Sequence, residues 1–220
     1  VQQLLDRGAD PSLTGNDGLA AYHYVLSAAV STPRYAQQKS AQLYTLLKPE
    51  SLSLQVDGRL IKLDNRQMAM FLVLLMQALF HTHLGGALVF SEAFSAARLA
   101  ECVAHLPEAL LPGRRKRRSY ISSQLSQHEV NSKHPYGKKL FLRLNHGQYI
   151  LNPGLKIRQG ERWCAVYALQ SPEDLGHDLQ TYLQDMSPEL VKILGGKKDV
   201  YKYSEEAVGY WAEMIRRAAQ

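Results

Sequence analysis

Residues 52–79 read LSLQVDGRLIKLDNRQMAMFLVLLMQAL, and this stretch predicts a β-hairpin that leads directly into a long helix. The alternation of apolar and polar residues over 52–56 is typical of a strand with one buried face. Asp57-Gly58 is a strong signal for a two-residue turn, after which an apolar run returns. We expect Asp64 to cap the helix. Because apolar residues occupy all of its faces, we expect this helix to be buried nearly all round and to form the core of a central domain.

Two further helices are predicted after a loop that follows the first one and begins at His81. Ser91 is expected to cap a helix whose apolar stripe ends before Pro107. A third helix begins within or after the basic run RRKRR over residues 114–118. Its apolar stripe consists of Ile121 and Leu125, with His128 as a candidate third member. The third helix is therefore predicted to be mostly polar.

A second hairpin is predicted around residues 145–147, because alternating apolar runs flank this turn. The order hairpin, three helices, hairpin over residues 50–152 resembles a winged-helix domain, and DGRLIKLDNRQMAMFLVLL looks like the output domain of bacterial two-component response regulators. This resemblance implies that the third helix enters the major groove of DNA and that the second hairpin is the wing. Two positions depart from the family. Ser126 stands where Arg or Lys is usual, and the wing motif G-x-G-Y is reduced to residues 147–149, which predicts backbone-dominated contact with modest base readout.

The first 33 residues resemble one ankyrin repeat. Residues 8–11, GADP, match the turn after an outer helix, and residues 16–18, NDG, match the tip of the loop that follows. Residues 20–23, AAYH, lie where the family's inner helix starts with T-x-L-H, although the first and third of them depart from that motif. Since a lone repeat cannot bury its own faces, we expect either that earlier repeats precede Val1 or that this unit caps the neighbouring domain.

These patterns predict a mainly α fold with small β-hairpins, divided into three parts. Residues 1–48 are expected to form an ankyrin-like helical segment, residues 50–158 a winged helix-turn-helix domain, and residues 159–220 a helical tail. At the start of the tail, residues 163–169 are expected to form a buried strand or a short connecting segment.

Positive charge is concentrated in residues 113–158. This segment holds eleven of the twenty-six Lys and Arg residues and a single acid, Glu129, so its net charge is +10. The remainder of the chain carries fifteen basic and nineteen acidic residues. Because charge segregated in this way forms a local footprint, we expect the segment to bind a polyanion, and nucleic acid best fits a winged helix.

The candidate binding residues follow from placing the third helix in the groove. Candidate phosphate contacts, which carry positive charge before this helix or on and near the wing, are Arg114, Arg115, Lys116, Arg117, Arg118, Lys138, Lys139 and Arg143. Candidate base-reading side chains, which are polar and lie away from the apolar stripe, are Ser119, Ser122, Ser123, Ser126 and Gln127. The wing tip is predicted at Asn145 and His146.

Alternative interpretations remain open at the level of sequence. The basic run over 114–118 is also typical of a solvated loop or of a nuclear import signal, and the polar third helix is also compatible with an exposed scaffold. We therefore set two hypotheses side by side: a DNA-binding transcriptional regulator with an ankyrin-type interaction segment, and a protein-interaction adaptor or effector whose working face surrounds Tyr22 and Tyr24.

Enzyme and metal signals are weak. His81-x-His83 and Cys102-x-x-His105 contain metal-ligand residue types, but neither has the pattern of a zinc site, and phosphate-loop, nucleophile-elbow and paired-carboxylate motifs are missing from the sequence. We expect no enzymatic activity, no cofactor and no metal.

The expected partners are double-stranded DNA and a protein bound by the ankyrin-like segment, and no membrane. A palindromic target would require a homodimer, for which the predicted tail helix around Trp211 is a candidate. Two cysteines and the lack of an apolar leader after Val1 predict a cytoplasmic protein.

Overall fold

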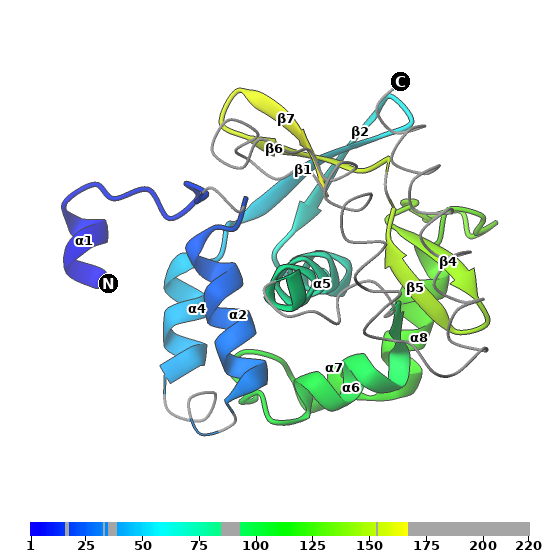
Figure 1. Cartoon of the computed structure of the whole chain (residues 1–220), viewed down its shortest axis with the longest axis horizontal. Helices are drawn as coiled ribbons and strands as arrows, with labels where there is room; N and C mark the ends of the chain where they lie inside the picture. Colours follow the sequence, from blue (N-terminus) through cyan, green and yellow to red (C-terminus); the bar gives the residue numbers. More distant parts are fainter. Residues whose placement is uncertain (16–17, 33, 35–38, 85–92, 153, 167–220) are drawn as a thin grey trace, which may run out of the picture.

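The computed structural model describes residues 1–15, 18–32, 34, 39–84, 93–152 and 154–166 (Figure 1). The described helices are α1 (Gln2–Asp6), α2 (Ala21–Ser31), α4 (Ala41–Leu47), α5 (Met68–Leu84), α6 (Ala96–Ala104), α7 (Gly113–Lys116) and α8 (Arg118–Gln127). The described strands are β1 (Ser51–Val56), β2 (Arg59–Asp64), β3 (Phe94–Ser95), β4 (Phe141–Asn145), β5 (Gln148–Leu151), β6 (Lys156–Gln159) and β7 (Arg162–Ala165). Nearly all of the predicted helical tail lies outside the described residues.

The prediction of a mainly α fold is wrong. The described residues are 43% helix and 22% strand, and their strands form two antiparallel sheets, so this part of the chain mixes α and β structure. The predicted hairpins are present, but each belongs to a larger sheet. β6 and β7 extend the first hairpin to four strands, and β3 adds a third strand to the second.

The four-stranded sheet has the order β2-β1-β6-β7. Its β1–β2 hairpin confirms the sequence prediction, with Leu52 opposite Leu63 and a turn in which Asp57 and Gly58 have φ angles of 49° and 73°. Positive φ at both central residues is the geometry of the type I′ turn, which favours Asp-Gly. On its other side β1 pairs with β6, so the strand that completes this sheet lies beyond the second hairpin in the chain.

Helix α5 lies at the centre of Figure 1, with the four-stranded sheet above it and α2 and α4 to its left. Every residue from Met68 to Leu79 is buried, which confirms the prediction of a core helix surrounded on all sides. The predicted N-cap at Asp64 is wrong, because this residue ends β2 opposite Ser51 and its Oδ1 accepts a hydrogen bond from the Arg66 amide (2.8 Å). The prediction that a loop begins at His81 is also wrong, since α5 continues to Leu84.

The amino-terminal segment joins the same core as α5. Helix α2 begins at Ala21, within the predicted inner-helix start, and its buried side chains belong to the hydrophobic cluster that includes α5. The Ala20 amide donates to His23 Nδ1 (3.0 Å), and His23 Nε2 lies 3.2 Å from Gln77 Oε1 of α5. Of the predicted loop tip, residues 16 and 17 lie outside the described residues.

The three-stranded sheet has the order β3-β5-β4 and lies to the right of α5 with α8 (Figure 1). Helix α6 starts at Ala96, where the Ser95 hydroxyl accepts a hydrogen bond from the Arg98 amide (3.1 Å). The predicted cap at Ser91 lies outside the described residues. The third helix and second hairpin are confirmed as α8 and β4–β5.

Strand β7 covers the first part of the predicted segment 163–169, and residues 167–169 lie outside the described residues. The prediction that this segment is buried is wrong for Trp163, which is 36% exposed on an edge strand. Within the described ranges, no helix has both the length and the apolar character that crossing a bilayer requires.

Candidate nucleic-acid interface

Helix α8 has one buried face and one polar exposed face. Ile121 and Leu125 are 0% exposed and anchor the helix in the core. The opposite face presents four exposed hydroxyl groups, which belong to Ser119, Ser122, Ser123 and Ser126. Four of the five predicted base-reading residues are therefore brought together at helical spacing.

Gln127, the fifth predicted base-reading residue, is placed differently. Its side chain is half-buried, and its Oε1 lies 3.4 Å from Gln124 Nε2, one helical turn away. Gln127 therefore contributes less to the exposed polar surface than the serine residues do.

A cluster of arginine residues lies at the amino-terminal end of α8. α7 is a single turn whose Gly113 amide donates to Glu108 Oε2 (2.8 Å). Arg114, Arg117 and Arg118 are exposed and Arg115 is half-buried, and within the described ranges none of these four forms an ion pair. No carboxylate of the described residues therefore neutralises their guanidinium groups.

Lys116 belongs to the same run but is engaged inside the protein. Its Nζ donates to the carbonyl oxygen of Leu106 and lies 3.5 Å from Glu108 Oε1, and its side chain is only 15% exposed. Lys116 therefore fixes the turn that precedes α8, and it is not presented to a ligand as its neighbours are.

The predicted phosphate contacts on and near the β4–β5 hairpin all have internal partners. Arg143 Nη2 lies 2.6 Å from Glu129 Oε2, and its guanidinium carbon lies 5.2 Å from the centre of the Tyr149 ring. Lys138 Nζ donates to Gln67 Oε1 (2.7 Å), and burial lowers the pKa of this ammonium group. Among the described residues, the structure thus separates an unpaired cluster before α8 from paired cations on and near the β4–β5 hairpin.

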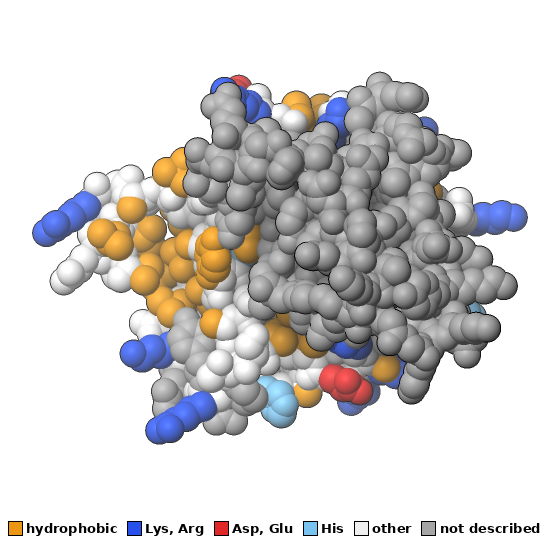
Figure 2. Space-filling view, in the orientation of Figure 1, with side chains coloured by type: hydrophobic (Ala, Val, Ile, Leu, Met, Phe, Trp, Pro, Cys, Tyr) orange, Lys and Arg blue, Asp and Glu red, His pale blue; other side chains and the backbone are white. Residues whose placement is uncertain are grey.

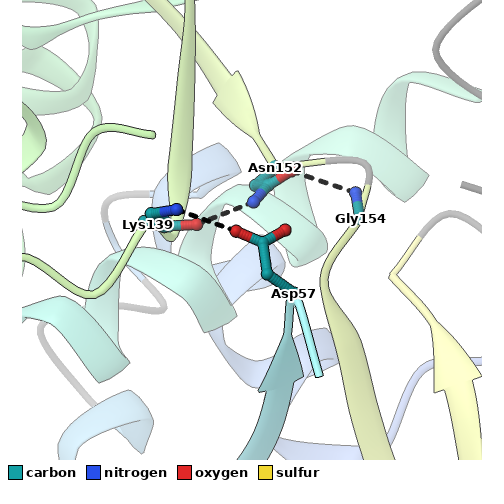
Figure 3. Close-up of polar contacts among 4 residues, drawn as sticks. All are labelled: Asp57, Lys139, Asn152 and Gly154. Carbon is teal, nitrogen blue, oxygen red and sulfur yellow. Dashed lines mark hydrogen bonds and ion pairs between the residues drawn. The ribbon is translucent and has the colours of Figure 1, made fainter. Parts of the chain in front are cut away.

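Lys139 links the start of the β4–β5 hairpin to the four-stranded sheet (Figure 3). Its Nζ lies 2.9 Å from Asp57 Oδ2, and its carbonyl oxygen accepts a hydrogen bond from Asn152 Nδ2 (2.8 Å). Asn152 Oδ1 in turn accepts from the Gly154 amide (3.0 Å), where the chain leaves β5. These contacts tie the segments that enter and leave the β4–β5 hairpin to the β1–β2 turn.

His128, at the carboxyl end of α8, is a feature that the sequence does not reveal beyond its place in the apolar stripe. The residue is 5% exposed, and its Nδ1 has no hydrogen-bond partner among the described residues. Desolvation, together with Lys138 and His134, lowers its pKa to about 4. His128 is therefore neutral at neutral pH and adds no charge to the interface.

The two residues predicted as the wing tip, Asn145 and His146, lie at the turn of the β4–β5 hairpin. Asn145 ends β4 opposite Gln148, and exposed His146 and Gly147 (φ 72°) make the turn. Within the described ranges no group of three or more His, Cys, Asp or Glu could hold a metal ion. Burial raises the pKa of the half-buried Cys102 thiol.

The chain shows no significant match to any protein-family model, any curated protein or any solved structure. Inferences about its function therefore depend on the geometry and charge described above.

Proposed function

We propose that this chain is a duplex-DNA-binding regulator that inserts α8 into the major groove. The order α5-β3-α6-α7-α8-β4-β5, in which α7 is a single turn and β5 lies between β3 and β4 in the sheet, supports a winged-helix architecture. In this architecture the exposed face of the third helix reads base edges and the hairpin that follows contacts the backbone.

The observation that carries the proposal is the junction of α7 and α8. Three exposed arginine residues without ion pairs among the described residues adjoin a face of exposed serine residues. The arginine residues would neutralise phosphates and release counterions, which gives affinity without sequence information. The serine hydroxyls can donate to or accept from base edges, which gives modest discrimination.

The dimensions of α8 fit this role. From Ser119 to Ser126 the helix rises about 10 Å at roughly 1.5 Å per residue, which corresponds to about three base-pair steps. A helix of this kind fits a major groove about 12 Å wide. The serine face would therefore read a short site, with register set by the arginine contacts to phosphate.

Salt-dependent binding to duplex DNA tests the proposal. The substitutions Arg114→Ala, Arg117→Ala and Arg118→Ala together should weaken binding and reduce the slope of log K against log salt by about 2 to 3. A matched control removes three exposed positive charges elsewhere, at Arg7, Arg34 and Lys39. Equal binding by the two triple variants, both folded, would overturn the proposal.

A second candidate function, a protein-interaction adaptor, is favoured by the surface of α2 and α4. Residues 18–32 and 41–47 contain no charged residue, and Figure 2 shows hydrophobic side chains gathered on this side of the molecule. Tyr24 is 51% exposed there. The expectation that Tyr22 shares this face is wrong, because Tyr22 is buried and desolvation raises its pKa to about 12.

The adaptor function predicts a partner whose binding survives the three arginine substitutions and is lost in Tyr24→Asp. Pull-down with the two variants, followed by affinity measurement with the purified partner, separates the two functions. A partner retained by Tyr24→Asp and lost by the arginine variant would exclude this role for the α2–α4 surface.

A further inference from the structure

The outward face of the four-stranded sheet has a composition that neither proposed function uses. In β1 the buried positions are Leu52, Leu54 and Val56, so Ser51, Ser53 and Gln55 point away from the core. The register places Leu60 and Lys156 on either side of Gln55, and it places Lys62 opposite Ser53. Short polar side chains on the central strand are thus flanked by long side chains on its neighbours.

The charges of this face are almost all positive. Lys62 and Lys156 are exposed, and within the described ranges neither forms an ion pair. Arg158, also exposed, lies 3.2 Å from Glu161 in the β6–β7 turn. The acid on β2 is Asp64 at the end of the strand, where its Oδ1 already accepts a backbone hydrogen bond. The centre of the face therefore presents uncompensated cations.

Two large apolar side chains lie among these cations. Leu60 is 73% exposed on β2, and Trp163 is 36% exposed on β7, where it lies opposite Arg158. A ligand that covers these two side chains would remove their apolar area from water, which is favourable. The combination of apolar side chains and unpaired cations indicates a surface for a ligand that is both acidic and apolar.

We infer that this face docks an acidic, extended segment of a partner protein whose apolar side chains cover Leu60 and Trp163. Neighbouring strands are about 4.8 Å apart, so Lys62 on β2 and Lys156 on β6 stand roughly 10 Å apart across β1 and about 7 Å apart along it, because they lie opposite Ser53 and Gln55. This spacing allows one extended chain to lie along the Ser51-Ser53-Gln55 row with carboxylates on both sides. The six residues of β1 span about 20 Å, enough for roughly six residues of the partner.

Single-stranded nucleic acid fits the face less well. Stacking platforms for unpaired bases use several aromatic side chains, whereas Trp163 is the one aromatic residue among the described outward positions of this sheet. The face is also separate from the candidate DNA surface, since Figure 1 places the four-stranded sheet at the top of the view and α8 at the lower right. Docking at the sheet therefore does not depend on DNA binding.

The test uses the full chain and a labelled peptide of about twelve residues in which Asp and Glu alternate with Leu and Phe. Fluorescence anisotropy should show binding that the double substitution Lys62→Glu and Lys156→Glu weakens at least about tenfold. The matched control reverses two exposed charges elsewhere, Arg34→Glu and Lys39→Glu, and should bind as the parent chain does. Duplex-DNA affinity should be similar in these two variants, because both carry the same change in net charge.

Trp163 supplies an independent readout. In a Trp211→Phe background Trp163 is the remaining tryptophan, so its emission should shift when the peptide binds, and Trp163→Ser should weaken binding at least threefold. Should the glutamate variant fail to fold, Lys62→Gln with Lys156→Gln takes its place. Three results would overturn the inference: peptide binding unaffected by the substitutions at Lys62 and Lys156, equal weakening in the control, or binding of single-stranded oligothymidylate at this face without the peptide.

Discussion

Asp57 and Lys139, 82 residues apart in the chain, are the two described non-glycine residues with positive φ angles, and they form an ion pair with each other at 2.9 Å. Asp57 needs its φ of 49° for the β1–β2 turn, in which Asp is well tolerated. Lys139 has a φ of 52° outside any such turn motif, and this conformation costs an ordinary side chain about 1 kcal/mol or more. The contacts to Asp57 and Asn152 hold it there.

Substitutions at Lys139 separate strain from ion pairing. Lys139→Ala loses the ion pair and keeps the left-handed backbone, whereas Lys139→Gly loses the ion pair and relieves the strain. Because both partners of the pair are about half exposed, the pair itself contributes less than about 1 kcal/mol. We expect the glycine variant to be more stable than the alanine variant by about 1 kcal/mol in urea unfolding. Equal or reversed stabilities would show that Lys139 is unstrained in solution.

His128 should make the stability of the protein depend on pH. Its folded pKa of about 4 lies below the ordinary value of 6.5, so its contribution is fully present above pH 6.5 and is lost as the pH falls through 4. The loss amounts to at most about 3 kcal/mol. His128→Leu should therefore flatten the dependence of unfolding free energy on pH between 7 and 4. His105→Gln, at an exposed position, is the control, and a slope unchanged by His128→Leu would refute this role.

Glu129 should restrain DNA binding by occupying Arg143. The two side chains are 2.6 Å apart, and the carboxylate is mostly buried. In Glu129→Gln the side chain keeps its shape but loses its charge, which frees one guanidinium for phosphate. We expect duplex affinity to rise several-fold and the salt slope to increase by about 0.9. Glu161→Gln, which frees Arg158 on the other sheet, should leave both unchanged. A Glu129→Gln variant with parental affinity would place Arg143 away from DNA.

The serine face of α8 should govern specificity more than affinity. Ser122→Ala with Ser126→Ala removes two exposed hydroxyls without altering charge. Duplexes selected by the parent chain from a random pool should lose about 1 kcal/mol of preference over random sequence, while binding to random duplex stays the same. Ser31→Ala, at the exposed end of α2, is the control and should change neither the preference for selected duplexes nor the binding to random duplex. An equal loss on selected and random duplex would assign these hydroxyls to phosphate contact.

His23 should couple the amino-terminal segment to α5. Its ring accepts a hydrogen bond from the Ala20 amide and contacts Gln77 Oε1, and it is buried. His23→Leu leaves both the Ala20 amide and Gln77 Oε1 without this hydrogen-bond partner, and it should destabilise the protein by about 2 kcal/mol or more. His23→Leu with Gln77→Leu should recover part of this loss, since one orphaned polar group is also removed. Leu13→Ala, at a 72% exposed site, should have little effect, and a similarly small effect of His23→Leu would contradict the coupling.

Elements with strong local signals could be predicted from sequence. The Asp57-Gly58 turn, the apolar α5 and the Ile121–Leu125 stripe all appear as expected, because turn chemistry and hydrophobic periodicity act within a few residues. β6 was missed because Lys-Ile-Arg-Gln offers a single apolar residue, and its strand conformation depends on pairing with β1, about one hundred residues earlier.

The candidate site could be predicted only in part. The sequence gives the charge of the basic residues but not their partners. As candidate phosphate contacts, Arg143 and Lys139 are therefore equivalent to Arg117 in the sequence, whereas in the structure Glu129 pairs with Arg143 and Asp57 pairs with Lys139. Tyr22 and Tyr24 likewise differ in burial, because residues two apart in a helix point to different sides of it. The spacing predicts that the two side chains diverge. Which of them is buried depends on the side of α2 that packs against the core.

The pairing of Leu54 with Ile157 also bears on how the chain is made. During synthesis the β1–β2 hairpin emerges from the ribosome well before β6, at roughly 5–20 residues per second, and β1 then has an edge without its strand partner. An open edge of this kind is a template for pairing with other chains. Premature termination after the β4–β5 hairpin would yield a product that retains α8 and the arginine cluster but leaves the edge of β1 unpaired, so such truncated chains should be prone to aggregate.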